Sequence, residues 1–593
     1  MASRHCNRQE KVGDMNIYKR MFAYVPKSKW KGYLAVLFSG VSALMIVVGY
    51  FFVYRILVEL LATQNLTQAR NLALTTMVVL TLGGVLYFLS GLFSHMLGFR
   101  LETNLRKKGI DGISKASFRF FDTHQSGVVR KTIDDNAVKT HTSVAHMIPD
   151  MGQAFLTPIC VFIISFIIDW KLFVALLVMT ALGVGLMAKM MGGETSFMQI
   201  YQDALQKLSG ETVEYVRGIQ VIKIFKADVK SFKALYEAIQ NYAKYAYAYA
   251  QSCQIPYVTY QWLFYGIAAI VIIPVVLFLS VFSDPVFLMV DLIMLLFLSG
   301  IISVCCMRIM YASQYIFEAT YALDTLEKLY AEMFEDKLSF GTETAFSSYD
   351  IAFDQVSFSY GEKSVFSDLS FSLEQGKTYA LVGSSGSGKS TIAKLLSGFY
   401  KVDSGAIKIG GKSIESYTEE TMTEAVSFVF QDPKLFKLSI YDNVALAKKH
   451  ATHDEVMQAL YLAGCDDILD KFPERERTLI GSKGVYLSGG EKQRIAIARA
   501  MLKNSPIVVM DEASAAIDAD NEYKLQQSFK NLMKDKTVIM IAHRLSSIQD
   551  VDEIIVLEQG ALVERGSHAE LMAQDSTYKQ LVELYNTTND WRL

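Results

Sequence analysis

The sequence predicts a multi-domain membrane protein, in which a six-helix α transmembrane domain is followed by an α/β domain with a phosphate-binding loop. Long apolar runs occupy the first half of the 593 residues, and the chain as a whole is 51% hydrophobic and 20% charged. A glycine-rich loop between a strand-like and a helix-like run lies in the second half. The formal net charge of −2 comes without a basic stripe in either half, so no nucleic-acid partner is expected.

Six apolar segments are long enough to cross about 30 Å of hydrocarbon, which takes roughly 20 helical residues. They lie near residues 32–56, 72–96, 147–168, 171–191, 258–282 and 286–309. Basic residues concentrate in the polar stretches 97–146 and 192–257, which the positive-inside rule places in the cytoplasm. Both termini then lie inside the cell as well. We expect a multi-pass protein of a bacterial cell membrane, inner or plasma, surrounded by lipid.

The two cytoplasmic stretches show helical periodicity, in "LETNLRKKGIDGISKASFRFF" and "ALQKLSGETVEYVRGIQVIKIF". We therefore expect the spans to continue as helices beyond the membrane and to be joined by short turns. The turns near 120–127 and 214–218 are candidates for contact with a soluble domain. Solvated helices without a mechanical role are the alternative.

Several groups in the spans have two interpretations. An unpaired carboxylate at mid-membrane would cost about 3 kcal/mol, so Asp291 either lies near the outer interface or lines a wet cavity. The segment "IPYVTYQWLFYG", residues 255–266, either faces a polar cavity that receives substrate or forms an interfacial aromatic belt. We expect "YAKYAYAYAQS", residues 242–252, to serve helix packing. Cys305 and Cys306 are expected to be apolar filler rather than ligands of a soft metal.

Near residue 350 the sequence changes to β-branched runs punctuated by glycine. This change predicts a cytoplasmic N-terminal segment (1–30), a transmembrane domain with six helices and two long cytoplasmic extensions (31–325), a linker (326–349) and a soluble α/β domain (350–593).

The loop "GSSGSGKST", residues 383–391, fits the G-x-x-x-x-G-K-[ST] pattern between the strand "TYALV" and the helix "TIAKLLSGF". Glycines at 383, 386 and 388 let the backbone curl until its N–H groups point at phosphate. Lys389 can reach the terminal phosphates, and the Ser390 hydroxyl can ligate Mg²⁺. The binding residues expected here are Gly383, Ser384, Ser385, Gly386, Ser387, Gly388, Lys389, Ser390 and Thr391.

The apolar run in "PIVVMDEASAAID" ends in two carboxylates, Asp511 and Glu512. Asp511 is expected to hold Mg²⁺ through water, and Glu512 to orient and polarise the water that attacks a γ-phosphate. A solvated acidic turn is the alternative. Gln431 in "VFQDP" and His543 in "MIAHRLS" also follow short β-like runs, which would aim each polar tip at the same place. Taken alone, either residue would more often be structural.

The stretch "YLSGGEKQR", residues 486–494, combines a small hydroxyl, Ser488, with Gly489 and Gly490 at the start of a charged helix. Bare backbone amides at a helix start suit an anion. The stretch therefore predicts a second phosphate contact, about a hundred residues after the first loop.

The series Tyr360, "GSSGSGKST", Gln431, "LSGGE", "VVMDE", Asp518 and His543 closely resembles the ATPase domain of ABC transporters. With six preceding spans, nearly the whole chain resembles a half-transporter of the exporter-type (type IV) fold. The resemblance implies ATP and Mg²⁺ as cofactors and transport-coupled hydrolysis of ATP. It also implies a partner, a second half-transporter chain that is either identical or paralogous.

In that family two ATPase domains meet head to tail. Ser488 and the amides near Gly490 would then cap the γ-phosphate of ATP held by the phosphate loop of the other chain. Neither site would close alone. ATP would join the two soluble domains, and the extended helices would switch the side of the membrane to which a shared cavity opens.

The resemblance also implies roles for the remaining motif residues. Tyr360 would stack on adenine, and Gln431 would sense both Mg²⁺ and the cytoplasmic hairpins. Asp518 would cross the dimer seam, and His543 would contact the γ-phosphate. Catalysis is thus assigned to Glu512, His543 and Gln431, and Mg²⁺ binding to Ser390, Gln431 and, through water, Asp511.

The chain departs from the commonest pattern of the family at three places. "GSKG" (481–484) stands for Gly-Glu-Arg-Gly, "LSGGE" for LSGGQ and "SAAID" (514–518) for Thr-Ser-Ala-Leu-Asp. Loss of the glutamate puts in doubt the cross-talk normally assigned to the 481–484 loop.

"LSGGE", "AAID", "FFDTHQSGVVRKTIDDNA" and "AHMIPDMGQAFLTP" are similar to the subgroup that includes the mycobactin and yersiniabactin importers, which are usually heterodimers. This softer resemblance favours uptake of a metal chelate or siderophore-like small molecule over export of a lipid, peptide or drug-like molecule. An ATP-gated channel is a remote alternative, because channels are rare in this architecture. A soluble ABC protein of translation or repair is excluded if the six spans form.

Overall fold

The computed structural model describes residues 17–191, 194–225, 232–266, 284–481, 484–511, 519–542 and 548–590. The chain divides into two compact units. The helical unit comprises residues 1–113 and 126–330, and the α/β unit comprises residues 114–125 and 331–593. A short segment from between two spans therefore belongs to the α/β unit.

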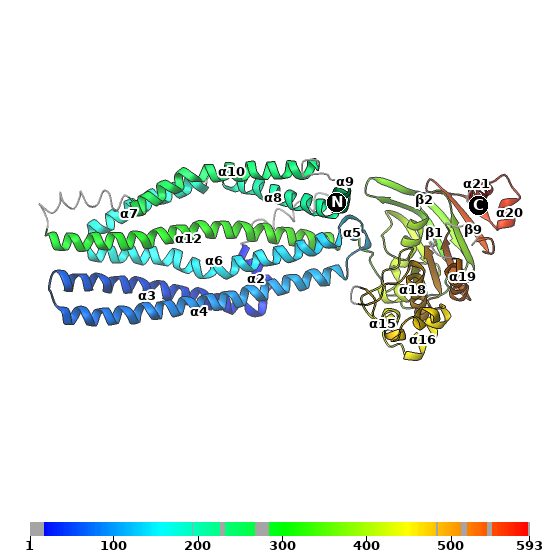
Figure 1. Cartoon of the computed structure of the whole chain (residues 1–593), viewed down its shortest axis with the longest axis horizontal. Coiled ribbons are helices and arrows are strands. Elements are labelled where there is room, and N and C mark those ends of the chain that lie inside the picture. The colour runs from blue at the N-terminus through cyan, green and yellow to red at the C-terminus, as the bar shows by residue number, and fades with distance from the viewer. Residues whose placement is uncertain are drawn as a thin grey trace. The chain divides into compact units, whose positions relative to one another are not determined.

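Long helices that lie side by side form the helical unit (Figure 1). They are α2 (Ile17–Ala23), η1 (Pro26–Ser28), α3 (Lys29–Leu61), α4 (Leu66–Ile113), α6 (Ser126–Ile168), α7 (Trp170–Met191), α8 (Glu194–Arg217), α9 (Ile219–Phe225), α10 (Lys233–Gln261), the π-helical η2 (Trp262–Gly266) and α12 (Pro285–Glu332). Helices α3, α4 and α6 pack against one another, and α10 packs against α7 and α8.

Five of the described helices are long and apolar enough to cross a membrane: 26–61, 66–113, 126–168, 170–190 and 285–332. They confirm five of the six expected spans, and most of the expected span 258–282 lies outside the described residues. Helices α4 and α6 continue well beyond their apolar segments, as the periodicity predicts. Helix α12 continues to Glu332, past the expected domain end at 325, because buried Leu326, Leu329 and Tyr330 extend its apolar face.

Hydroxyl and small residues allow α3 and α4 to approach closely. Ser42 Oγ donates to the carbonyl oxygen of Gly83 at 2.8 Å, and Ser90 Oγ donates to that of Ala35 at 2.6 Å. All four residues are buried at this contact. In lipid, apolar burial alone gives little driving force for helices to associate. Backbone-directed hydrogen bonds of this kind hold membrane helices together.

A polar network connects four helices inside the helical unit. The Tyr87 hydroxyl of α4 donates to Asp150 Oδ1 of α6 at 2.8 Å, and Arg308 Nε of α12 lies 3.6 Å from the same oxygen. Arg308 also donates to Gln153 Oε1, and Gln153 Nε2 donates to Ser42 Oγ of α3 at 3.3 Å. The Arg308 and Asp150 side chains are 25% and 26% exposed, so each charge depends on its partner for solvation.

The α/β unit combines ten strands and several helices among its described residues. The strands are β1 (Ile351–Tyr360), β2 (Lys363–Leu373), β3 (Thr378–Val382), β4 (Ser404–Ile409), β5 (Lys412–Ser413), β6 (Val426–Val429), β7 (Ile507–Asp511), β8 (Thr537–Ile541), β9 (Glu553–Glu558) and β10 (Ala561–Gly566). The helices are α5 (Phe118–Thr123), α13 (Lys389–Leu396), η3 (Ile414–Ser416), α14 (Glu419–Ala425), α15 (Ile440–Ala445), α16 (His453–Leu462), α17 (Asp466–Asp470), η4 (Arg475–Arg477), α18 (Gly489–Lys503), α19 (Ala519–Met533), α20 (His568–Met572) and α21 (Thr577–Asp590).

Two sheets organise this unit. The smaller is antiparallel with the order β2-β1-β4-β5, and the larger has the order β10-β9-β3-β8-β7-β6. In the larger sheet β9, β3, β8, β7 and β6 are parallel, and β10 runs antiparallel to β9. The register pairs Ile541 of β8 with both Leu381 of β3 and Asp511 of β7. The carboxyl ends of these strands therefore meet at one edge, where parallel sheets bind ligands.

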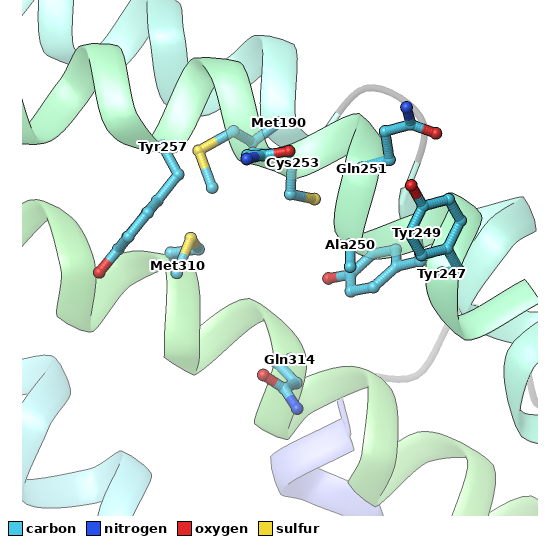
Figure 2. Close-up of a pocket in the computed structure, with 10 residues that line it drawn as sticks. Met190, Tyr247, Tyr249, Ala250, Gln251, Cys253, Tyr257, Met310 and Gln314 are labelled. Atoms are coloured by element: carbon cyan, nitrogen blue, oxygen red, sulfur yellow. The ribbon is translucent and has the colours of Figure 1, made fainter. Parts of the chain in front are cut away.

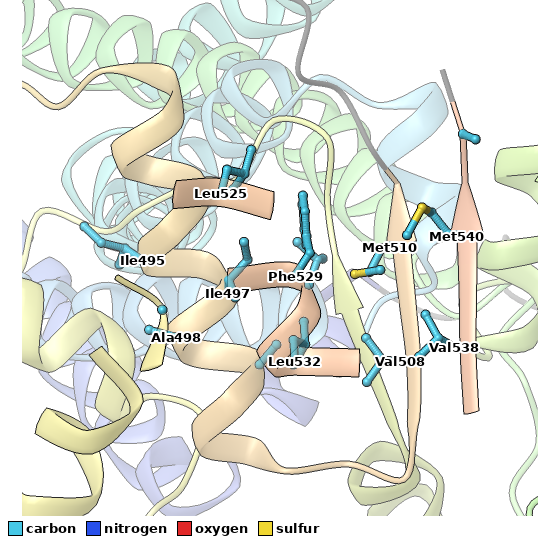
Figure 3. Close-up of a cluster of buried hydrophobic side chains, with 14 of the residues drawn as sticks. Ile495, Ile497, Ala498, Val508, Met510, Leu525, Phe529, Leu532, Val538 and Met540 are labelled. Atoms are coloured by element: carbon cyan, nitrogen blue, oxygen red, sulfur yellow. The ribbon is translucent and has the colours of Figure 1, made fainter. Parts of the chain in front are cut away.

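Helices α18 and α19 pack on one face of the larger sheet (Figure 3). The side chains at the interface between these helices and the sheet are apolar, and they are fully buried or nearly so. This cluster includes Ile495, Ile497, Ala498, Val508, Met510, Leu525, Phe529, Leu532, Val538 and Met540. The packing fixes the start of α18 and the end of β7 relative to each other.

Candidate nucleotide site

The phosphate loop follows β3, which coincides with the expected strand "TYALV". Gly383, Gly386 and Gly388 have φ angles of +148°, +84° and +102°, in the region that favours glycine. A Cβ on Gly383 would lie 2.1 Å from the Leu557 carbonyl oxygen, and one on Gly388 would lie 2.4 Å from the Phe366 ring. The tight curl of this loop thus requires glycine at both positions.

Lys389, the first residue of α13, folds over the loop. Its Nζ donates to the carbonyl oxygens of Gly383 and Ser384, both at 2.8 Å, and to Ser387 Oγ at 3.4 Å. Burial lowers the pKa of Lys389, and the negative charge of Asp511 opposes this shift. An ammonium group enclosed by oxygens in a glycine loop fits the phosphate oxygens of a nucleotide, which could share or replace these contacts.

Tyr360, at the end of β1, lies beside the start of α13. Its hydroxyl is 3.4 Å from Thr391 Oγ1, and its ring meets the Tyr400 ring edge to face, with centroids 5.6 Å apart. Tyr360 is half-buried and lies near the loop. Stacking of Tyr360 on adenine stays a prediction.

The sheet register places two further expected residues at the same edge. Asp511 is the last residue of β7 and is half-buried, and Gln431 is exposed two residues after β6. Ser390, Asp511 and Gln431 offer the oxygen ligands that Mg²⁺ prefers. No group of three His, Cys, Asp or Glu suited to a metal occurs among the described residues, so Mg²⁺ here would take its other ligands from phosphate and water. Glu512, Asp518 and His543 lie outside the described residues.

Ser488 is the N-cap of α18, a helix of 15 residues. Its Oγ accepts from the Glu491 N–H at 3.3 Å, and Glu491 Oε2 accepts from the Ser488 N–H at 2.7 Å. This reciprocal pair is a capping box. Ser488 and Gly489 are exposed and Gly490 is buried, so the helix start is open to a partner or ligand.

The helical unit contains a cavity of about 440 Å³ between α7, α10 and α12 (Figure 2). It is lined by Met190, Tyr247, Tyr249, Ala250, Gln251, Cys253, Gln254, Tyr257, Met310 and Gln314. None of these described lining residues carries a charge at neutral pH. Phenol, amide and thioether groups therefore form the wall.

The cavity shows which aromatic residues of the segment 255–266 face a polar cavity and which do not. Tyr257 lines it, Tyr260 is buried with its hydroxyl bonded to the Ser303 carbonyl oxygen, and Trp262 and Tyr265 are each 53% exposed. The segment 255–266 thus combines cavity, core and outward-facing residues. Asp291 is not among the described residues that line this cavity.

The expectation that residues 242–252 serve helix packing is confirmed only in part. Tyr247, Tyr249, Ala250 and Gln251 line the cavity, although Tyr242 does pack, with its hydroxyl 3.0 Å from that of Tyr201 on α8. A recurrence of polar side chains three or four residues apart, at 247, 251, 254 and 257, is the signal that marks this face of α10.

Comparison with known proteins defines the class. Residues 366–515 match the family model described as "ABC transporter", and residues 33–301 match the one described as "ABC transporter transmembrane region". The chain belongs to the ABC transporters, with a membrane region and an ABC ATPase domain in one polypeptide. Its fold is shared with "Structure of a bacterial Atm1-family ABC exporter with ATP bound", at a TM-score of 0.77, 24% identity, and coverage of 95% of this chain and 99% of that chain.

Two kinds of curated relative stand out. The mycobactin import ATP-binding/permease protein IrtA of Mycolicibacterium smegmatis is 31% identical over 562 residues, which cover 92% of this chain. The ATP-dependent lipid A-core flippase of Haemophilus ducreyi is 46% identical over 237 residues, which cover 40% of this chain. The chain spans 64% of the length of the mycobactin relative and 41% of the length of the flippase.

Proposed function

We propose that this chain is one half of an ATP-driven membrane transporter that works as a dimer by alternating access. One observation supports this most directly: the glycine loop, Lys389 and Asp511 lie at one edge of a parallel sheet, in a chain that also carries membrane-length helices. ATP shared between two opposed α/β units would draw them together, and hydrolysis would release them.

The residues at the sheet edge would divide the work. Lys389 and the loop amides hold the phosphates, and Ser390, Gln431 and, through water, Asp511 hold Mg²⁺. When bound, Mg²⁺ neutralises the charge that develops on the phosphates. Glu512 orients the attacking water and acts as the general base that accepts its proton, and His543 contacts the γ-phosphate. Tyr360 supports adenine, and Asp518 crosses to the partner chain.

Replacement of the base tests the hydrolytic part. Glu512→Gln keeps the shape of the side chain and removes its basicity, so turnover should fall by about 100-fold or more while MgATP still binds. ATPase rate and equilibrium binding of labelled ATP, measured on the same purified assembly, separate the two effects. Normal hydrolysis by this variant would remove Glu512 from the role of base.

The shared site has its own test. Ser488 and the amides near Gly490 would cap the ATP held by the partner chain, so a lesion in one chain damages the site of the other. Differently tagged chains, purified as mixed dimers with Ser488→Ala in one chain, should lose at least half of their ATPase activity. Full activity with the lesion in either chain would contradict a shared site. Co-purification of a second polypeptide would show whether the partner is a paralogue or a copy.

We also propose that the substrate is a neutral metal chelate and that it moves inward. The described cavity wall supports this proposal in two ways. Its phenols and amides can hydrogen-bond the oxygens of a chelate, and it contains no basic group that could pair with lipid phosphates. The mycobactin relative also matches over 92% of this chain, against 40% for the lipid flippase. Export of a lipid, peptide or drug-like molecule is the second candidate, favoured by the flippase match and by the shared exporter fold.

Vesicles with the ATPase domains facing outward would decide the direction. Uptake predicts that ATP moves ferric chelate out of the lumen, toward the ATPase side, and accumulation in the lumen would defeat this proposal. Tyr257→Ala, which removes a phenol from the cavity, should reduce transport at least about fivefold. Tyr265→Ala is the matched control, since Tyr265 is 53% exposed and is not among the lining residues.

A further inference from the structure

Two ion pairs join α17 to α18 within the α/β unit. Arg494 Nη1 lies 2.9 Å from Asp467 Oδ1, and Nη2 donates to Oδ2 at 3.2 Å. The second pair joins Lys471, the C-cap of α17, to Glu491 Oε1. Glu491 and Arg494 are one helical turn apart on α18, as are Asp467 and Lys471 on the other side, so the pairs form two adjacent rungs.

The ion pair nearest the start of α18 places a carboxylate beside a proposed phosphate site. Glu491 is 6% exposed and accepts from both the Ser488 N–H and the Lys471 ammonium. Burial acts to raise the pKa of Glu491, but the hydrogen bonds from Lys471 and Ser488 outweigh it and lower the pKa. Glu491 is therefore ionised at neutral pH, three residues from the hydroxyl proposed to meet a γ-phosphate.

A negative charge at this place repels a phosphate and so opposes the attraction that the partial positive charge of a helix start exerts on an anion. A neutral residue at this position would need no countercharge. Here the Lys471 ammonium supplies the countercharge. The Lys471 side chain is 52% exposed, so it can cancel the charge of Glu491 without itself being buried.

We propose that Lys471 is a positioning residue for ATP hydrolysis: it holds Glu491 in the capping box and cancels its charge, so that the start of α18 accepts the γ-phosphate of ATP bound by the partner chain. This inference rests on the proposed function. In this scheme Lys471 contacts neither the nucleotide nor the attacking water, and it acts through Glu491 alone.

The chain contains the same device at a place without a proposed nucleotide role. Thr452 and Glu455 form a capping box at the start of α16, and Lys448 Nζ lies 2.5 Å from Glu455 Oε1. If a lysine beside a capping box only stabilises a helix, Lys448 and Lys471 should behave alike. Lys448→Met is therefore the matched control for Lys471→Met.

The experiment compares Lys471→Met, Lys471→Arg, Lys448→Met, Glu491→Gln and the double variant Lys471→Met/Glu491→Gln in the purified transporter assembly. We expect Lys471→Met to lower kcat/KM for MgATP about tenfold, mainly through KM, because an uncancelled charge opposes phosphate. Lys471→Arg and Lys448→Met should stay within about twofold of the unmodified chain. The double variant should match Glu491→Gln, because without the carboxylate no countercharge is needed.

Three results would overturn the inference: Lys471→Met with normal kcat/KM, equal losses in Lys471→Met and Lys448→Met, or a double variant that stays well below Glu491→Gln. If Lys471→Met fails to fold, the double variant decides alone. Failure of the proposed function would look different. A mixed dimer indifferent to Ser488→Ala would refute the shared site, whereas a crippled Ser488→Ala dimer beside a fully active Lys471→Met refutes the role of Lys471 alone.

Discussion

The Phe118 ring of α5 stacks on the Phe399 ring, with centroids 3.9 Å apart and planes inclined by 14°. On the same short helix, Asp122 accepts a hydrogen bond from the Tyr400 hydroxyl, and Arg119 donates to the Ser359 carbonyl oxygen. Helix α5 is thus anchored in the α/β unit, while the chain on both sides of it belongs to the helical unit. This contact confirms the expected docking turn near 120–127, shifted toward Phe118.

Loss of the stacked ring should separate hydrolysis from transport. In Phe118→Ala the α/β unit keeps its nucleotide residues but loses an aromatic contact worth about 1 kcal/mol beyond its area. We expect transport to fall at least about fivefold while ATPase activity falls less than twofold. Phe121→Ala is the control: Phe121 is similarly exposed on the same helix, 42% against 46%, and its ring contacts Phe120. Parallel losses of transport and hydrolysis in Phe118→Ala would argue against a coupling role.

The phosphate loop should not tolerate a methyl group at its first glycine. In Gly383→Ala the new Cβ would meet the Leu557 carbonyl oxygen at 2.1 Å, so the loop must move away from β9. We expect MgATP affinity to fall at least tenfold and stability to fall by roughly 2 kcal/mol. Gly361→Ala serves as control, since Gly361 also has positive φ, +59°, but has no atom within 4 Å of the added Cβ. ATP binding and thermal unfolding, measured together, check both effects.

Asp467 should make the stability of the α/β unit sensitive to acid. Burial acts to raise its pKa, but the hydrogen bonds from Arg494 and Lys524 outweigh this and lower the pKa. A carboxyl whose folded pKa lies below its unfolded value of about 3.9 stabilises the fold above that pH and loses this contribution as the pH falls through the folded pKa. The gap in unfolding midpoint between the unmodified chain and Asp467→Asn should therefore shrink below about pH 4.

The control for this titration is the neighbouring exposed residue, in Asp466→Asn. Its unfolding midpoint should follow that of the unmodified chain at every pH. A gap between the unmodified chain and Asp467→Asn that stays constant from pH 7 to about pH 3 would show that the ion pair contributes no pH-dependent stability.

The membrane network should fail when one charge is left behind. Arg308→Met leaves Asp150 without the guanidinium 3.6 Å away, and we expect a loss of about 3 kcal/mol in detergent-solubilised protein. Arg308→Met/Asp150→Asn removes both charges and should recover much of this loss. The ion pair between Arg130 and Asp134 offers a control. Arg130→Met should have little effect, because the Arg130 side chain is 85% exposed. If the double variant is less stable than Arg308→Met, the pair does not explain the loss.

Local patterns predict the strand, the glycine loop and the helix around Lys389. Three glycines, a lysine and a hydroxyl at fixed spacing define the loop because its geometry depends on consecutive backbone atoms. Strands β3 and β7 are recognisable because their residues are apolar on both faces, as in a parallel sheet covered by helices. The roles of Glu512, Asp518 and His543 stay predictions.

Contacts between distant segments could not be predicted in the same way. Tyr and Ala alternate along α10, and that pattern does not say which helix faces the tyrosines; the cavity depends on α12, where Met310 and Gln314 complete the wall. The pairing of Lys471 with Glu491 depends likewise on the path of the chain between α17 and α18. Glu491 reads from the sequence as a departure from the family pattern, and its countercharge becomes visible in the packed structure.

The membership of α5 in the α/β unit has a consequence for biosynthesis. Phe118 leaves the ribosome long before Phe399, so α5 must wait, with its aromatic face uncovered, until the sheets are made and folded. A fragment translated from residue 331 onward would contain every strand yet leave the Phe399 ring without its cover. The α/β unit is complete only when its early segment, residues 114–125, and its later segment, from residue 331 onward, have both been synthesised, which links quality control of the soluble part to correct insertion of the first helices.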